Sequence, residues 1–391
     1  MQLHMTKIIK RGTMTPSSYL YRLRLATIYV ALCLMTACQS NEISLLNPED
    51  FKSQIDGKDV QLYTLSNANG ITMQVTNYGA KVMSLYVPDR NGKFDDIVTG
   101  FETIEETSTQ MAYFGATIGR YANRIKEGLF TLDSVQYQLS TNNGSNHSHG
   151  GQKGFCNRVW QVDEVSNSHI KLTYLSPDGE EGYPGNLTVT CTYSLTDHNE
   201  FKIDYRASTD NPTIVNLTQH SFFNLKGAGK GQILDHLLEV NATSYLPTDH
   251  NSIPIGNYEK VLNTPFDFIT PREIGDMIES GDEQLKYGKG YDHTFVLNKY
   301  DGLINYAAKL IEPLSGRVME VYTNEPGLHV YSGNFLKNTM GKYGETYEYR
   351  EAICLETQHF PNSPNEPTFP STRLNPNEEY TSTTIYRFLT Q

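Results

Sequence analysis

Strand-like segments separated by turn residues recur along most of this chain, and they constrain its fold more than any other feature. Residues 71–94, ITMQVTNYGAKVMSLYVPDRNGKF, predict two strands and a turn at Arg90-Asn91-Gly92. Residues 170–209 predict three strands, separated by loops at Asp178-Gly179 and at 197–199. The alternating segment YTSTTIYRFLT, 380–390, predicts a closing strand.

Helix signals are few. The strongest is TPREIGDMIES, 270–280, where Thr270 can cap, Pro271 suits the first turn and Glu273 completes a capping box. Aromatic residues make up 11% of the chain, including 26 Tyr, and aromatic and β-branched residues favour strands. Many strands with one or two short helices predict an all-β fold: a large antiparallel β-sandwich with a few short helices, forming a single domain over 51–391.

The first 37 residues have the pattern of an export signal. They hold five basic residues and no acid, and they end in the apolar segment LATIYVALCLMTA, 25–37, which is too short to span a bilayer as a helix. Two small residues then precede Cys38, and LMTAC resembles a bacterial lipoprotein box in which the cysteine is lipidated. We therefore expect a signal peptide at 1–37, a tether at 38–50, and export as a lipoprotein anchored through Cys38 and facing the periplasm or the cell exterior. An ordinary signal peptide cut nearby is the alternative.

The charge balance excludes one class of partner. Without the first 37 residues the chain keeps 27 basic and 44 acidic residues, a net charge of −17. Such an acidic body repels the phosphates of nucleic acid and suits a protein that acts on neutral solutes. Three cysteines, Cys156, Cys191 and Cys354, remain in the body, and their wide spacing predicts neither a disulfide framework nor a metal knot.

Five segments place ionisable residues inside strand-like sequence, and they are the candidates for chemistry. The last is the most informative, because Cys354 and Glu356 share one face of a predicted strand and put a carboxylate at an inward position. The five segments are IGRYANRI (118–125), NHSHGG (146–151), NLTQHSFFNL (216–225), KGYDHTFVL (289–297) and CLETQHFPNSPN (354–365).

Each candidate also has a structural interpretation when it is taken alone. His147 and His149 would point the same way on a strand and could bind a metal, but no acid lies near them in sequence, and Gly150-Gly151 favours a loop over a ligand. We therefore predict no metal.

The remaining candidates are equally open when taken singly. A histidine beside aromatic residues, such as His220, is usually a hydrogen-bonded core residue, and Arg120 and Arg124 are solvated by default. Asp292 could be a simple turn acid, and Glu356 could be half of a structural ion pair.

Taken together, the segments resemble the galactose mutarotase (aldose 1-epimerase) family. Seven motifs occur in the family's order, from about Tyr63 to the last strand: GRYANRI, HGG, EGYPGNL (181–187), NLTQHSFFNL, YDHTFVL, PGLHVYSGNF (326–335) and CLETQHFPNSPNEPTFPSTRL. The resemblance implies the antiparallel supersandwich of that family and an enzyme that interconverts the α and β anomers of free aldohexoses of the glucose and galactose type.

The resemblance also implies how the residues share the work. Glu356 would be the base that takes the C1 hydroxyl proton, and His220 the acid that protonates the ring oxygen, with no cofactor and no metal. Ordinary pKa values of about 4.3 and 6.5 would leave a pH window in which the carboxylate is ionised and the imidazole is protonated. We expect neighbouring negative charge to widen this window upward.

Five further residues would hold the monosaccharide. The resemblance places the family's sugar-binding asparagine and arginine on Asn123 and Arg124, its HGG histidine on His149, and its sugar-binding acid on Asp292. This chain departs from the family at His329, where glutamine is common. His359 is expected to be a strand-end contact and not a second acid.

Other functions remain as alternatives at this point. A non-catalytic cell-surface carbohydrate-binding protein on the same fold would need neither Glu356 nor His220 at these positions. An epimerase of hexose 6-phosphates should carry extra basic residues for the phosphate, and a two-carboxylate glycosidase should supply a second acid at the reacting centre.

Overall fold

The computed structural model describes residues 43–110 and 113–391, and residues 43–391 form one compact unit. The predicted signal peptide and the predicted lipid site at Cys38 lie outside the described residues. The tether is predicted to end at residue 50, but the compact unit already begins at Ile43. Leu46 is buried, and its N–H and C=O bond the side chain of Gln74 at 2.8 and 3.0 Å. Residues 43–50 therefore belong to the body.

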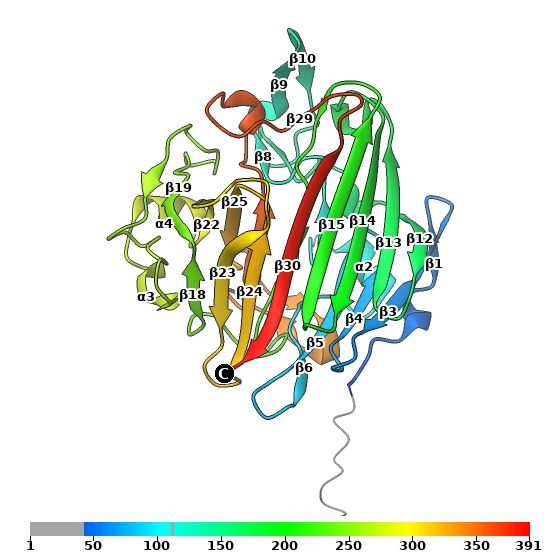
Figure 1. Ribbon diagram of the computed structural model, residues 1–391, viewed down its shortest axis with the longest axis vertical. Coiled ribbons are helices and arrows are strands. Elements are labelled where there is room, and N and C mark those ends of the chain that lie inside the picture. The colour runs from blue at the N-terminus through cyan, green and yellow to red at the C-terminus, as the bar shows by residue number, and fades with distance from the viewer. Residues whose placement is uncertain (1–42, 111–112) are drawn as a thin grey trace, which may run out of the picture. The chain divides into compact units, whose positions relative to one another are not determined.

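The largest sheet has nine strands in the order β12-β13-β14-β15-β30-β24-β23-β18-β21 and faces the viewer in Figure 1. Their bounds are Gln161–Val165 (β12), His169–Ser176 (β13), Leu187–Thr196 (β14), Glu200–Thr209 (β15), Tyr380–Thr390 (β30), Arg317–Thr323 (β24), Asn305–Ile311 (β23), Leu237–Val240 (β18) and Arg272–Glu273 (β21). The three strands predicted over 170–209 and the last strand are confirmed as β13, β14, β15 and β30.

Two smaller sheets complete the framework. A five-stranded sheet, β20-β19-β22-β25-β28, comprises Glu259–Lys260, Ala242–Tyr245, Asp292–Leu297, Gly327–Tyr331 and Cys354–Gln358. A four-stranded sheet, β3-β4-β5-β6, comprises Leu62–Ser66, Thr72–Thr76, Lys81–Pro88 and Phe94–Asp96. One apolar core joins all three sheets, with Val75, Ile203 and Leu355 as members from the four-, nine- and five-stranded sheets. The predicted all-β antiparallel sandwich is confirmed.

Six two-stranded ribbons decorate this framework, and two of them carry site residues. They are β1/β2 (Ser53–Ile55, Lys58–Val60), β9/β10 (Leu129–Leu132, Val135–Gln138), β8/β11 (Arg124–Ile125, His147–Ser148), β16/β29 (Thr213–Ile214, Arg373–Leu374), β7/β17 (Ala116–Ile118, Thr218–His220) and β26/β27 (Thr339–Met340, Thr346–Tyr347). All of these strand pairs are antiparallel.

Helices are short, as predicted, but the predicted capping box is wrong. Among the described residues the α-helices are α2 (Ile104–Thr109), α3 (Gly275–Ile278) and α4 (Glu283–Gly288), and none of the described helices is long and apolar enough to cross a membrane. Arg272 and Glu273 form β21 and pair with Leu238 and Leu237, so Glu273 does not cap α3. A capping box is found instead on α2, between Thr103 and Glu106. Single 3-10 turns are η1 (Pro48–Phe51), η2 (Lys126–Gly128), η3 (Phe155–Asn157), η4 (Glu180–Gly182), η5 (Lys342–Gly344) and η6 (Ser363–Asn365).

Candidate active site

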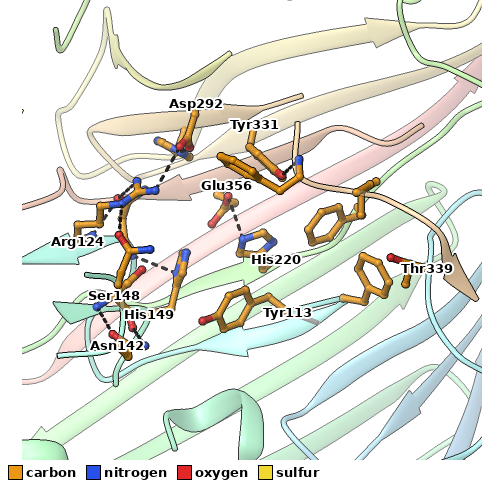
Figure 2. A pocket seen from close by; sticks show the side chains of 17 residues that line it. Tyr113, Arg124, Asn142, Ser148, His149, His220, Asp292, Tyr331, Thr339 and Glu356 are labelled. Atoms are coloured by element: carbon orange, nitrogen blue, oxygen red, sulfur yellow. Dashed lines mark hydrogen bonds and ion pairs between the residues drawn. The ribbon is translucent and has the colours of Figure 1, made fainter. Parts of the chain in front are cut away.

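A pocket of about 420 Å³ brings together all seven residues that the sequence predicted for the site. Figure 2 shows polar side chains on one side of the pocket, His220 and Glu356 in its middle, and aromatic rings on the other side. The seven predicted residues are Asn123, Arg124, His149, His220, Asp292, His329 and Glu356. A pocket with hydrogen-bonding groups at one end and ring faces at the other suits a molecule such as a pyranose, which has both hydroxyl groups and apolar C–H faces.

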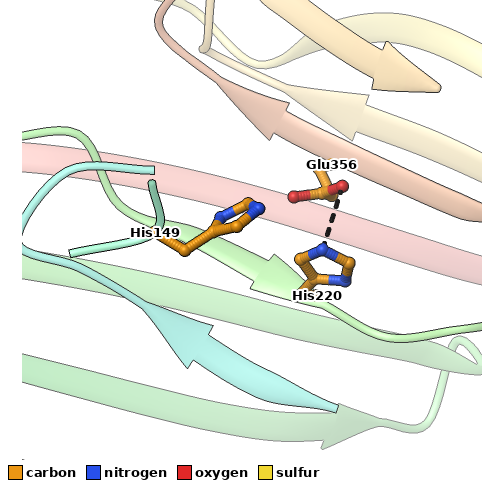
Figure 3. A group of neighbouring side chains, drawn as sticks. All are labelled: His149, His220 and Glu356. Carbon is orange, nitrogen blue, oxygen red and sulfur yellow. Dashed lines mark ion pairs between the residues drawn. The ribbon is translucent and has the colours of Figure 1, made fainter. Parts of the chain in front are cut away.

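His220 and Glu356 meet because their two strands run side by side. The backbones of Phe223 and Ile353 exchange hydrogen bonds of 2.8 and 2.9 Å, and the Thr218 hydroxyl donates to the carbonyl of Thr357. His220 ends β17, and Glu356 lies at the centre of β28, where both side chains turn into the pocket. His220 Nε2 lies 3.5 Å from Glu356 Oε1 (Figure 3). The inward carboxylate of the sequence thus belongs to the pocket, and no arginine of the described residues forms an ion pair with it.

Burial changes the charges of this pair. The desolvation of Glu356, followed by the negative charge of Asp292, raises the pKa of Glu356 well above 4.5, although Arg124 opposes the rise. Burial, followed by the charge of His329, lowers the pKa of His220 to about 3. The expectation that neighbouring negative charge would raise the histidine pKa is therefore wrong, because desolvation outweighs it. Both shifts favour the uncharged forms, in which Glu356 carries the one proton that the pair shares.

The second carboxylate of the pocket has the opposite environment. Arg124 Nη2 lies 3.3 Å from Asp292 Oδ2, and His329 Nε2 lies 2.8 Å from Asp292 Oδ1. Although burial raises the pKa of Asp292, the Arg124 charge and the His329 hydrogen bond hold it well below 3.8. His329 is in turn held through Nδ1 by the Thr294 hydroxyl at 2.9 Å. Asp292 is therefore kept ionised, whereas the environment of Glu356 allows it to gain and lose a proton.

His329 also faces Glu356 directly across the sheet. The two residues pair in the β25–β28 register, and Thr294 is the next partner along, on β22. The His329 ring is therefore held on both nitrogens, by Thr294 and by Asp292.

Asn123 and His149 reach the pocket through strained backbone. Both are non-glycine residues with positive φ, +61° and +50°, a conformation more common at functional positions than elsewhere. Asn123 Oδ1 accepts from the Arg124 backbone N–H at 2.8 Å, and the Asn123 backbone N–H donates to His149 Nδ1 at 3.3 Å. The next residue must be glycine: Gly150 has φ +84°, and a Cβ there would lie 1.8 Å from the Gly119 carbonyl oxygen.

The donor atoms of His149, His220 and Glu356 lie within 4.8 Å of one another, a spacing that invites comparison with a metal site. Zinc binds the lone pair of an imidazole nitrogen. Because His149 Nδ1 accepts the Asn123 N–H, its proton lies on Nε2, which then donates a hydrogen bond and offers no lone pair. The orientation of His149 suits a hydroxyl group better than a metal ion.

Three other residues weighed in the sequence lie outside the pocket. His147 does not point the same way as His149: its ring bonds the Ser140 carbonyl and the Tyr183 hydroxyl, each at 2.6 Å. Arg120 was expected to be solvated but is buried, and its guanidinium donates to backbone carbonyls such as that of Gly185 at 2.9 Å. His359 is a strand-end contact, with Nδ1 2.6 Å from Glu325 Oε2.

The aromatic side of the pocket was not predicted. Phe222 stacks on His220 with ring centroids 5.0 Å apart, Tyr113 stacks at 5.6 Å, and Tyr331 also lines the wall. Phe222 and Tyr331 lie inside the motifs NLTQHSFFNL and PGLHVYSGNF. The motifs were identified from the sequence, but neither side chain was predicted to line the site. Nothing in the sequence around Tyr113 marked it as a site residue.

Comparison with known proteins identifies the family. The family model for aldose 1-epimerase matches residues 61–387. The chain belongs to the aldose 1-epimerase family. It is 43% identical over 319 residues to a galactose mutarotase from Sus scrofa, covering 81% of this chain and 91% of that relative. It is 38% identical over 339 residues to an aldose 1-epimerase from Escherichia coli K12, covering 86% and 97%.

Solved structures of the family have the same fold. An aldose epimerase homologue from C. elegans matches with a TM-score of 0.79 and 30% identity, covering 85% of this chain and 99% of that chain. A galactose 1-epimerase from Lactobacillus acidophilus matches with a TM-score of 0.76 and 31% identity, covering 86% and 97%. The family resemblance found in the sequence is confirmed.

Proposed function

We propose that this chain is an aldose 1-epimerase that interconverts the α and β anomers of free aldohexoses of the glucose and galactose type. The observation that carries the proposal is the pair of His220 Nε2 and Glu356 Oε1, 3.5 Å apart in the middle of the pocket. An acid and a base at this separation can reach two oxygens on one carbon, as O1 and O5 are on the anomeric carbon of a pyranose. The family's enzymes, at about 40% identity, support the same reaction.

The reaction follows from the positions of the two groups. Glu356 takes the proton of the C1 hydroxyl while His220 gives a proton to O5, the C1–O5 bond breaks, and C1 becomes an aldehyde. The aldehyde turns about the C1–C2 bond. The O5 hydroxyl then attacks the other face of C1, His220 recovers its proton from O5, and Glu356 returns one to the new hydroxyl. Protons balance at every step, and the pair ends as it began.

Sugar binding must first move the shared proton. Burial favours the protonated form of Glu356, and Glu356 Oε2 has no hydrogen-bond partner among the described residues. Hydroxyl groups of the sugar can donate hydrogen bonds to this carboxylate and compensate for its burial. The ionised form of Glu356 is then stabilised, and the proton passes to His220 across the 3.5 Å contact.

The polar side of the pocket would hold and orient the ring. Arg124, Asn123 and His149 offer N–H donors, while Asp292 offers a carboxylate that stays ionised. These groups are fixed by one another, so little side-chain entropy is lost when a sugar binds. His329 holds Asp292, and its replacement of the common glutamine is expected to tune which hydroxyl pattern is preferred.

Arg124→Ala is expected to weaken sugar binding more than turnover. The guanidinium both donates to the sugar and holds Asp292, and hydrogen bonds to charged groups are among the stronger ones in proteins. We expect KM to rise by about 10- to 100-fold, with kcat lowered less. Steady-state polarimetry over a range of sugar concentrations separates the two constants. A loss in kcat with unchanged KM would instead place Arg124 in the chemical step.

The pH dependence should reflect a pair that carries one proton. Because the pKa of His220 is lowered to about 3, a second proton joins the pair only well below the ordinary histidine value of 6.5. Because the pKa of Glu356 is raised, the shared proton is retained to a pH well above 4.5. A bell-shaped profile of kcat/KM is expected, with its acid limb below 6.5. An acid limb at 6.5 or higher would contradict these shifts.

The direct test is polarimetry on freshly dissolved α-D-glucose and α-D-galactose with catalytic amounts of protein. Acceleration over buffer is expected for at least one of them. A protein that binds these sugars, by calorimetry, but leaves the buffer rate unchanged would be a carbohydrate-binding protein on the same fold, and the proposed function would be wrong.

We also propose that the enzyme is exported and held at a membrane by a lipid on Cys38. This proposal rests on the basic N-terminus, the apolar segment 25–37 and the LMTAC sequence. Labelling of cells with a radioactive lipid precursor should mark the wild-type protein. It should not mark the Cys38→Ala variant, and an unlabelled wild-type protein would overturn the proposal.

A further inference from the structure

Cys354 contacts the side of the His220 ring that faces away from Glu356. Its Sγ lies 3.5 Å from His220 Nδ1, while Glu356 Oε1 lies 3.5 Å from Nε2 of the same ring. Cys354 and Glu356 are two residues apart on β28, so one face of one strand reaches both nitrogens. Cys354 is completely buried, and it is not among the residues that line the pocket.

The proposed reaction requires His220 to keep a proton on Nδ1, and stacking of aromatic rings cannot ensure this. After His220 gives its Nε2 proton to O5, the neutral ring must keep its other proton on Nδ1, so that the Nε2 lone pair can take a proton back. A neutral imidazole can instead carry its proton on either nitrogen. Phe222 and Tyr113 stack on the His220 ring, with centroids 5.0 and 5.6 Å away, and restrict the orientation of its plane. Stacking does not distinguish a ring from the same ring turned over.

We propose that Cys354 is a positioning residue for His220: its sulfur accepts the Nδ1–H, keeps that proton on Nδ1, and holds Nε2 toward Glu356 and the sugar. The inference rests on the proposed role of His220 as the acid.

A thiol suits this position because it stays neutral. Burial raises the pKa of Cys354 well above its ordinary value of 9.0, and the charge of Glu356 adds to the rise. A carboxylate at Nδ1 would stabilise the imidazolium and make it a weaker acid. A neutral, weakly accepting sulfur orients the ring and leaves the Nε2 proton easy to transfer.

The chain offers a matched control in Cys191. This cysteine is also completely buried, but it lies on β14, with Sγ 3.8 Å from the Thr117 hydroxyl, and is not among the residues that line the pocket. Cys354→Ala and Cys191→Ala remove the same atoms from two buried sites, so both are expected to lower the melting temperature. Only the first should affect His220. Cys354→Ser restores a group that can accept from Nδ1–H.

The experiment combines steady-state kinetics with ¹⁵N NMR of histidine-labelled protein. In the wild type we expect the His220 signals of a neutral ring protonated on Nδ1. In Cys354→Ala we expect a mixture of both tautomers and a kcat lower by about three- to tenfold, with KM within about twofold. Cys354→Ser should recover most of kcat and the wild-type tautomer, and Cys191→Ala should keep both.

Three outcomes would overturn the inference. One is a wild-type ring protonated on Nε2, and another is full kcat in Cys354→Ala. The third is a loss of kcat that leaves the tautomer unchanged and that serine does not repair, which would mean that Cys354 only fills space. If no variant and no wild-type protein accelerates mutarotation, the proposed function fails, while the NMR signals still decide whether Cys354 controls the ring.

Discussion

Glu356→Gln is expected to lower kcat by about 10²- to 10⁴-fold while the sugar still binds. The amide has nearly the same shape as the carboxyl group, so the packing of β28 is retained, but it cannot take the C1 hydroxyl proton. Polarimetry measures the rate, and calorimetry measures binding on the same preparation. Turnover near the wild-type rate would mean that Glu356 is not the base.

The same variant has an expected effect on stability that separates chemistry from folding. The pKa of Glu356 is raised in the folded protein, so a free glutamate in the unfolded chain ionises first, and stability falls as pH rises above 4.5 toward the folded value. Glutamine removes this loss. We expect Glu356→Gln to be at least as stable as the wild type at neutral pH, with an advantage that grows as pH rises. A loss of activity in a protein of undiminished melting temperature cannot be explained by unfolding.

Glu325→Gln is the matched control. Glu325 is also a buried acid, but it bonds His359 and Tyr380, and it is not among the residues that line the pocket. We expect this variant to lose stability, because a buried histidine–carboxylate contact is broken, and to keep its kcat within a few-fold. If both glutamine variants lost activity equally, the loss would come from the general disturbance of a buried acid.

The fold could largely be predicted, because strands show a local alternation of core and surface residues in the sequence. The segment 170–209 alternates between core and surface for the length of β13, β14 and β15, and polar turns separate the three strands. The helix near Pro271 was misplaced because local propensity competed with a distant partner. Arg272 and Glu273 extend the sheet beside β18, and the sequence of their own segment does not predict that pairing.

The residues of the site could be predicted from the sequence, but the pKa shift of His220 could not. Motifs marked residues from six segments that β8, β11, β17, β22, β25 and β28 bring to one pocket, and all seven predicted side chains line it. The predicted direction of the His220 pKa shift was wrong, because the shift depends on how completely the ring is desolvated. The rings of Phe222 and Tyr113 stack on His220 and contribute to that burial, and such tertiary contacts cannot be predicted from the local sequence around His220.

His220→Asn is expected to lower kcat by about 10²- to 10⁴-fold, as strongly as the loss of the base. Asparagine can still form a hydrogen bond toward O5, but it has no proton to give at the pH of the reaction. Sugar binding should survive, because Arg124 and Asp292 remain paired. The matched control is His236→Asn, a fully buried histidine whose Nε2 accepts the Leu225 N–H and which is not among the residues that line the pocket. The His236→Asn variant should be less stable than the wild type and should keep the wild-type kcat.

The double variant tests whether the two residues act as one unit. A proton taken from O1 by Glu356 is useful only if O5 receives one from His220, so removal of either group should disable the same step. Glu356→Gln combined with His220→Asn is therefore expected to be about as slow as either single variant, because effects within one catalytic unit are strongly non-additive. If the two losses multiplied instead, the acid and the base would act in separate steps, and the concerted transfer of one proton from O1 to Glu356 and another from His220 to O5 would be wrong.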